Sequence, residues 1–278
     1  MAELEIQGTK ICYEDLNPKA EHCVAFFNGV MASYASWYLL YPVFQKMGWR
    51  VILHDMRGQL KSGKPEGPYS FKQHADDAKA LFDHLGVRNV HCIGTSYGGE
   101  AAMRMAFEYP EYVASLSLIG VTSELDEVLK GFMKNWLFLL DHGDGEDMFW
   151  GLAHTIYGDK FLAENHTMLQ GRAAAVKNNP DGYLDGLKIL FSTFANDVTM
   201  SDQLHRIKCP ALVLWAEDDF LQPRKLSEII VNNIPNSEFM IIPGSGHVTI
   251  FEKPKELASA ITGFVLKNEL LAKGLITT

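Results

Sequence analysis

The segment from Gly94 to Gly99, which reads GTSYGG, carries the residues best suited to covalent chemistry. It follows the apolar run 90–93 and precedes a helical stretch, so Ser96 is expected in a sharp turn between a strand and a helix. Such a turn has a strained backbone and needs small residues two positions before and after the serine, which Gly94 and Gly98 provide. The start of the following helix would also favour the negative oxygen that forms during attack. These features predict that Ser96 is a nucleophile.

A serine nucleophile needs a base, and His247 is the predicted one. It ends the glycine-containing segment 243–247, PGSGH, which follows the apolar run 239–242 and precedes the final helix. A histidine on a loop past the last strand can reach a serine at the carboxyl edge of the same sheet and take its proton. We therefore interpret His247 as a general base rather than as a capping or surface histidine.

An acid that orients the base is expected in the turn after the apolar run 211–215. Three carboxylates, Glu217, Asp218 and Asp219, crowd this turn. A carboxylate hydrogen-bonded to the imidazole holds it in the correct tautomer and stabilises its charged form. The crowding of three acids leaves the choice among them open at this point.

The turn around Ser96, the order of serine, acid and histidine along the chain, and most of the chain's length resemble the α/β-hydrolase fold family. Within that family the resemblance is to serine hydrolases such as carboxylesterases and enol-lactone hydrolases. It implies an acyl transfer in two steps, with a covalent acyl-enzyme on Ser96, and it implies no metal and no organic cofactor. A serine at the turn also argues against the branches of this fold that attack through an aspartate.

The resemblance favours Asp219 as the acid, because this residue stands at the family's usual distance before Pro223. Asp218 is the nearest alternative, and Glu217 is interpreted as structural. Some relatives place the acid after the preceding strand instead, and the residues that could serve there are Glu124 and Asp126.

The resemblance also implies an oxyanion hole made of two backbone N–H groups. One belongs to Tyr97, and the other lies in the loop after the run 23–27. Asn28 stands there where many relatives have a histidine, which puts the hydrogen bonds of the loop in question. Because the donor is a backbone group, Val30 is the expected second donor, with Met31 as the alternative. The family's turn at 54–62, which has a leucine where a glycine is usual, is interpreted as structural.

Short apolar runs alternate with amphipathic helices, a pattern that predicts a mostly parallel sheet with helices on both faces. The expected helices include one from Ser70 to Leu85, with Ser70 as its N-cap, and a last one beginning near Pro254. The expected fold class is α/β, a twisted eight-stranded sheet of the α/β-hydrolase type. The eight expected strands are 4–6, 10–14, 23–27, 50–54, 90–94, 113–119, 211–215 and 238–242.

The long segment between the predicted strands 113–119 and 211–215 is rich in Phe, Trp, Leu and Met and lacks a convincing strand. We interpret residues 121–201 as an inserted helical lid, and residues 1–120 and 202–278 as the core domain. The residues assigned to substrate binding are Trp136 in the lid, Met31 in the oxyanion loop and Val248 beside the base. A basic residue facing the pocket would support a substrate with a carboxylate, and the candidates are Lys130, Lys134 and Arg172.

Composition narrows the possible partners. The chain has 278 residues, 47% of them hydrophobic, and its 25 basic and 34 acidic side chains give a net charge of -9. No run of Lys and Arg is long enough to follow phosphates, so nucleic acid is not an expected partner.

The N-terminal residues 1–9 lack a signal-peptide pattern, and no membrane span is expected, so a cytoplasmic protein is predicted. The cluster around Asp141 and Asp147 is interpreted as a solvated acidic turn and not as a metal site.

An apolar pocket beneath a lid favours esters of short to medium acids. The leading hypothesis is therefore a carboxylic-ester hydrolase that acts on a small-molecule ester or lactone. An enol-lactone hydrolase and a carbon–carbon bond hydrolase would use the same triad and are the nearest alternatives. A hydrolase-fold ligand receptor or signalling protein is the alternative from another class, and very slow turnover with ligand-dependent melting shifts would support it.

Overall fold

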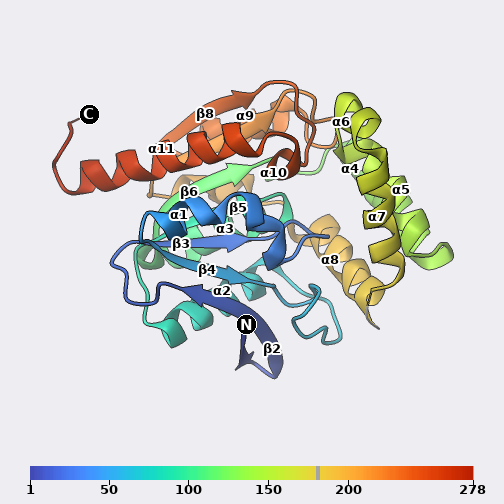
Figure 1. Ribbon diagram of the computed structural model, residues 1–278, viewed down its shortest axis with the longest axis horizontal. Helices are drawn as coiled ribbons and strands as arrows, with labels where there is room; N and C mark the ends of the chain where they lie inside the picture. Colours follow the sequence, from blue (N-terminus) through green and yellow to red (C-terminus); the bar gives the residue numbers. More distant parts are fainter. Residues whose placement is uncertain (180–181, 278) are drawn as a thin grey trace.

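The computed structural model describes residues 1–179 and 182–277. A single eight-stranded sheet forms its centre, in the order β1-β2-β4-β3-β5-β6-β7-β8 (Figure 1). Strand β2 pairs antiparallel with β1 and β4, and the other neighbours pair in parallel. The strands are β1 (Ala2–Ile6), β2 (Thr9–Leu16), β3 (Cys23–Phe27), β4 (Arg50–His54), β5 (Val90–Thr95), β6 (Val113–Ile119), β7 (Ala211–Ala216) and β8 (Ser237–Ile242).

The central strands are buried over their whole length. Every residue of β3, CVAFF, and of β4, RVILH, is buried. Parallel strands covered on both faces read as continuous apolar runs instead of alternating ones, and this is the signal that predicts them from sequence. The eight predicted strands are confirmed, with ends that differ by two residues at most.

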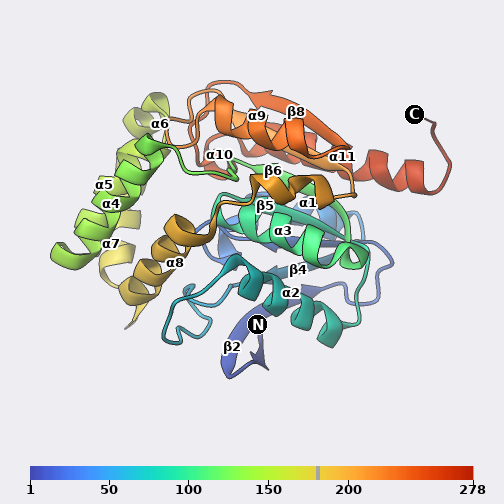
Figure 2. The same ribbon diagram turned by 180° about the vertical axis from the view of Figure 1, so that it is seen from behind.

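Helices pack on both faces of the sheet. Helices α2 (Phe71–Leu85), α3 (Tyr97–Glu108) and α9 (Arg224–Asn233) lie on one face, and α1 (Tyr41–Lys46) and α11 (Pro254–Ala272) lie on the other (Figures 1 and 2). The predicted N-cap of α2 is confirmed, because the Ser70 side chain accepts a hydrogen bond from the Gln73 N–H. No helix within the described residues is both long and apolar enough to cross a bilayer.

Between β6 and β7 the described residues form helices and no strand, as the sequence predicts. These insertion helices, α4 to α8, gather beyond the carboxyl ends of the parallel strands (Figures 1 and 2). The division of the chain into a core of 1–120 and 202–278 and a lid of 121–201 stays a prediction. The insertion helices are α4 (Glu127–His142), α5 (Gly145–Ile156), α6 (Asp159–Glu164), α7 (His166–Lys177) and α8 (Tyr183–Asp197).

Candidate active site

Ser96 lies in the tight turn from β5 into α3. Its backbone has φ 49° and ψ −130°, a conformation that a residue with a side chain rarely adopts and that costs energy. The N–H of Ser96 donates to the carbonyl oxygen of Ile119 at 2.9 Å, and its own carbonyl oxygen accepts from the N–H of Gly99 at 2.6 Å. These hydrogen bonds hold the strained turn in place.

The glycines on either side of Ser96 are required by close backbone contacts. A Cβ atom on Gly94 would lie 2.6 Å from the Cα of Gly99, and a Cβ atom on Gly98 would lie 2.2 Å from the carbonyl oxygen of Phe27. No side chain fits at these distances. Gly94 and Gly98 therefore allow β3, β5 and α3 to approach one another around Ser96.

His247 and Asp219 form a buried hydrogen-bonded pair. The Nδ1–H of His247 donates to Oδ2 of Asp219 at 2.7 Å, and the backbone N–H of Gln222 donates to the other carboxylate oxygen at 2.8 Å. Burial by itself lowers the pKa of His247, but nearby carboxylates, chiefly that of Asp219, together outweigh this effect and raise the pKa above its usual value of 6.5. The pair thus holds the imidazole in one orientation and favours its charged form.

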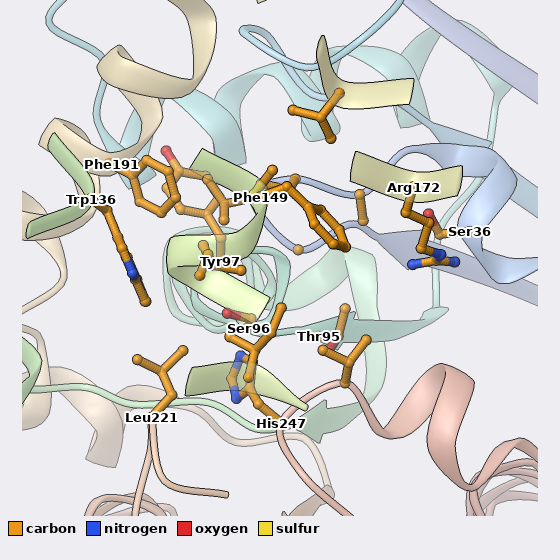
Figure 3. A pocket seen from close by; sticks show the side chains of 18 of the residues that line it. Ser36, Thr95, Ser96, Tyr97, Trp136, Phe149, Arg172, Phe191, Leu221 and His247 are labelled. Atoms are coloured by element: carbon orange, nitrogen blue, oxygen red, sulfur yellow. The ribbon is translucent and has the colours of Figure 1, made fainter. Parts of the chain in front are cut away.

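Ser96 and His247 are neighbours at one wall of a pocket (Figure 3). The carbonyl that binds the Ser96 N–H belongs to Ile119, and the next residue, Gly120, packs against the imidazole. A Cβ atom on Gly120 would lie 3.0 Å from Nδ1 of His247. Because Nδ1 is bonded to Asp219, Nε2 is the ring nitrogen left to take a proton from a serine hydroxyl.

The other carboxylates that the sequence suggests after β7, and Asp126 after β6, are exposed or form contacts elsewhere. Asp218 and Glu217 are exposed, and Glu217 accepts a hydrogen bond from the Gly244 N–H at 3.1 Å. Asp126 caps α4 and forms an ion pair with Lys225 at 2.7 Å. Among the acids that the sequence suggests, the geometry of the described chain therefore favours Asp219 as the partner of His247.

The two residues predicted to supply the oxyanion hole, Tyr97 and Val30, lie beside Ser96 in the same pocket. Tyr97 is the first residue of α3, so its N–H has no partner within the helix. Its buried hydroxyl lies 2.7 Å from Nε2 of His74, which anchors the side chain. On the other side, Val30 lines the same pocket and follows Gly29, whose added Cβ atom would lie 3.8 Å from the Cβ of Ser96.

Asn28, which departs from the family's histidine, fits its buried place well. Its side-chain oxygen accepts a hydrogen bond from Nε1–H of Trp37 at 2.8 Å, and its Nδ2 donates to the carbonyl oxygen of His54 at 2.8 Å. Both polar atoms of the Asn28 side chain therefore have partners, so this buried side chain is fully hydrogen-bonded.

The pocket in front of Ser96 has a volume of about 340 Å³ and is mainly apolar. The three residues predicted to bind substrate, Met31, Trp136 and Val248, all line it. Of the aromatic residues that the sequence places in the insertion, some line the pocket and others, such as Phe138, are exposed. The aromatic side chains of the insertion that line it are Trp136, Phe149, Tyr157, Tyr183, Phe191 and Phe194.

Arg172 is the basic residue that the structure brings into this pocket. Lys130 and Lys134 line a separate cavity outside it. The guanidinium of Arg172 lies over the ring of Phe251, 3.8 Å from its centroid, and donates to the Tyr157 hydroxyl at 3.1 Å. Figure 3 shows Arg172 near Ser36, away from the end of the pocket that Trp136 occupies. Among the described residues that line the pocket, none is Asp, Glu or Lys.

Glu100, one helical turn after Ser96 on α3, is a buried acid that the sequence pattern does not single out. Its Oε1 accepts a hydrogen bond from the Thr122 N–H at 2.8 Å, whereas Oε2 has no partner within the described residues. Burial raises the pKa of Glu100 to about 8. Oε1 of the neighbouring Gln222 is also buried without a partner, so the protonated carboxyl suits this place better than the ionised one.

The acidic residues near Asp141 form ion pairs and caps. Asp141 pairs with Lys188, and Asp144 caps α5 and pairs with Lys177 at 2.9 Å. No group of three His, Cys, Asp or Glu side chains suited to a metal ion occurs in residues 1–179 and 182–277.

The fold and the geometry around Ser96 define a hydrolase of the α/β type, and comparison with known proteins agrees. The sequence matches the alpha/beta hydrolase fold family over residues 24–254. The protein therefore belongs to this family, and hydrolysis is the activity that the family supports.

Several known proteins resemble the chain over most of its length. "Putative carbamate hydrolase RutD" of Caulobacter vibrioides is 26% identical over 221 residues, covering 78% of this chain and 80% of that protein. A 2-hydroxy-6-oxononadienedioate/2-hydroxy-6-oxononatrienedioate hydrolase of Comamonas testosteroni is 28% identical over 212 residues, covering 73% and 72%. Among solved structures, MGS-M2, an alpha/beta hydrolase enzyme from a Medee basin deep-sea metagenome library, has a TM-score of 0.88 at 24% identity and covers 95% of this chain and 97% of its own. This structural likeness shows the fold.

Proposed function

We propose that this protein is a serine hydrolase that cleaves carboxylic esters through an acyl-enzyme on Ser96. One observation carries the proposal: Ser96, in its strained turn, shares a pocket wall with His247, whose Nδ1–H donates to the buried carboxylate of Asp219. A serine hydroxyl is a weak nucleophile, and an adjacent imidazole oriented by a carboxylate activates it.

The proposed reaction has two halves. In the first, Nε2 of His247 takes the proton of Ser96 as Oγ attacks the carbonyl carbon, and the oxyanion accepts hydrogen bonds from the N–H groups of Val30 and Tyr97. The intermediate collapses, and His247 passes the proton to the departing alcohol. In the second half, His247 activates a water that attacks the acyl-enzyme, which releases the acid and restores Ser96.

The pocket supports a small to medium, largely apolar acyl group. Its volume of about 340 Å³ is at the lower end of the range for small-molecule sites. Much of its wall comes from the insertion helices, to which we assign the role of a lid that shields the reaction from water. A cytoplasmic location belongs to the same proposal.

The proposal is tested with a series of p-nitrophenyl esters, from acetate to longer acids, on native protein and on Ser96→Ala. Turnover is expected to fall by at least about 10⁴-fold in the variant because the nucleophile is lost. Ser36→Ala, which changes another serine of the same pocket, is the matched control and should keep most of the activity. Absence of turnover in native protein on every ester would reject the esterase proposal and favour lactones, ring-cleavage products or a receptor role.

A second candidate is hydrolysis of an enol lactone or of a carbon–carbon bond in a substrate that carries a carboxylate, with the same triad. Arg172 favours it, because its guanidinium faces an apolar pocket and forms no ion pair with an acid of the described chain. A cation in such a place recognises a carboxylate through charge-assisted hydrogen bonds. The Comamonas testosteroni relative is named for hydrolysis of dioates, which agrees with this alternative.

This candidate is tested by comparing the mono-p-nitrophenyl ester of glutaric acid with the neutral valerate ester. Arg172→Met should lower kcat/KM for the glutarate ester by about tenfold or more, as expected for the loss of a charged hydrogen bond, and should leave the valerate ester nearly unchanged. Arg172→Lys keeps the charge and should retain part of the preference. Equal losses on both esters would mean that Arg172 only braces the pocket.

A further inference from the structure

Gln59 is a buried side chain with a complete set of hydrogen bonds that converge on the loop after β3. Its Oε1 accepts from the Met56 N–H at 2.9 Å and from Nδ2 of Asn28 at 3.0 Å. Its Nε2 donates to the carbonyl oxygen of Gly29 at 2.9 Å. Gln59 lies in the 54–62 turn, which the sequence pattern predicts to be structural. Its amide nevertheless reaches the loop that faces Ser96.

The orientation of the Gln59 amide follows from its donors. Both groups that meet Oε1, the backbone N–H of Met56 and the Nδ2 of Asn28, can only donate, so this atom must be the oxygen. Asn28 is oriented in turn, because the indole N–H of Trp37 donates to its Oδ1. The chain of hydrogen bonds from Trp37 through Asn28 therefore leaves the Gln59 NH₂ group directed at the Gly29 carbonyl.

The Gly29 carbonyl sets the direction of the next N–H. Its oxygen accepts from Gln59 and from the Ala32 N–H at 3.0 Å. In a planar trans peptide the C=O and N–H bonds point in opposite directions, so the N–H of Val30 points away from these two donors. Within the described residues this N–H donates to no protein acceptor, and Val30 lines the pocket beside Ser96.

We propose that Gln59 is a positioning residue of the oxyanion hole, which holds the Gly29–Val30 peptide so that the Val30 N–H faces the carbonyl oxygen of a substrate at Ser96. The inference rests on the proposed function and deepens it. A fixed carbonyl matters here because glycine has wide backbone freedom, so an unheld peptide next to Gly29 rotates easily and turns its N–H away. Donors fixed before the reaction stabilise the oxyanion most effectively.

Gln59→Glu separates the donor from the acceptor role. The new side chain keeps oxygens for Met56 and Asn28 but, when ionised, places a second acceptor against the Gly29 carbonyl, which repels it. We expect kcat for p-nitrophenyl butyrate to fall by about 10²-fold or more while KM changes by less than about threefold, as when one oxyanion donor is removed. Gln45→Glu adds the same charge on the exposed side of α1 and should leave both constants unchanged.

A second readout distinguishes positioning from a general structural role. A trifluoromethyl ketone that adds to the serine forms an oxyanion, whereas the corresponding trifluoromethyl carbinol is neutral and cannot add to the serine. Gln59→Glu should weaken binding of the ketone in parallel with kcat/KM and leave inhibition by the carbinol unchanged. Gln59→Met, which removes the donor without adding charge, should show the same split if Gln59→Glu folds poorly.

The outcomes separate this inference from the proposed function. If native protein hydrolyses the ester and binds the ketone but both Gln59 variants keep native kcat, the positioning role is overturned and the esterase stands. If binding of the ketone and of the carbinol weakens equally, the side chain only supports the loop, which also overturns the positioning role. If native protein neither hydrolyses esters nor forms the ketone adduct, the proposed function fails and the inference fails with it.

Discussion

Glu100 makes stability depend on pH in a way that a single substitution should remove. Burial raises its pKa from the usual 4.5 to about 8 in the folded protein. Below pH 4.5 the carboxyl is protonated in both the folded and the unfolded chain, so it does not affect their balance. As the pH rises from 4.5 through 8, the unfolded chain loses its proton first, and folding stability declines.

The size of this effect follows from the two pKa values. Each pH unit between them contributes about 1.4 kcal/mol, which gives about 5 kcal/mol over the whole interval. Glu100→Gln has no proton to lose, and its amide can accept from the Thr122 N–H and donate to the unpartnered Oε1 of Gln222. The variant should therefore match native protein near pH 4.5 and exceed its stability by a few kcal/mol above pH 8.

Thermal unfolding followed by circular dichroism between pH 4.5 and 9 measures this difference. At about 2 to 4 °C per kcal/mol, Tm of Glu100→Gln should exceed that of native protein by roughly 10 °C at pH 8.5 and by little at pH 4.5. Glu111→Gln, at an exposed position, is the matched control and should follow the native curve. A constant difference between Glu100→Gln and native protein across the pH range would refute the reasoning, because Glu100 would then ionise in the fold as it does in the unfolded chain.

Two further predictions concern the turn and the base. Gly98→Ala places a methyl group 2.2 Å from the Phe27 carbonyl, so the end of β3 must move, and we expect activity on p-nitrophenyl butyrate to fall by about 10²-fold or more with a lower Tm. Gly171→Ala is the control: the added Cβ meets nothing within 4 Å and lies in helix α7, so activity should stay unchanged and Tm should not fall. Because the pKa of His247 lies above 6.5, the acidic limb of the kcat/KM profile should be centred above pH 6.5, and a midpoint below that value would contradict the geometry of the pair.

The sheet and the turn around Ser96 were predictable because their signals are local. Strand β3 reads as an unbroken apolar run since both of its faces are covered, and the turn needs Gly94 and Gly98 because backbones approach closely there. A pattern of neighbouring residues is enough to detect such features. The same holds for the N-cap of α2, where Ser70 stands directly before the first helical residue.

The remaining features depend on how distant segments pack. The residue types alone leave three acids open after β7. The family resemblance favours Asp219, and the folded turn adds that Asp219 is buried whereas Glu217 and Asp218 are exposed. Helical periodicity likewise cannot say which basic residue of the insertion faces the pocket, because that depends on how the insertion helices pack against one another and over the strand ends. Arg172 lines the pocket and Lys134 does not. Gln59 and Glu100 are interpretable only once their partners, which come from other loops and helices, are known.

The pocket draws its parts from two sources. The proposed reactive groups, Ser96 and His247 with Asp219 behind, stand on loops that follow strands of the sheet, whereas Trp136 and Phe191 come from the insertion helices. Substitutions in those helices can therefore change the substrate specificity without altering the proposed catalytic triad. This modularity makes the chain a suitable starting point for directed evolution, in which libraries confined to α4 through α8 would explore new specificities on a constant reaction centre.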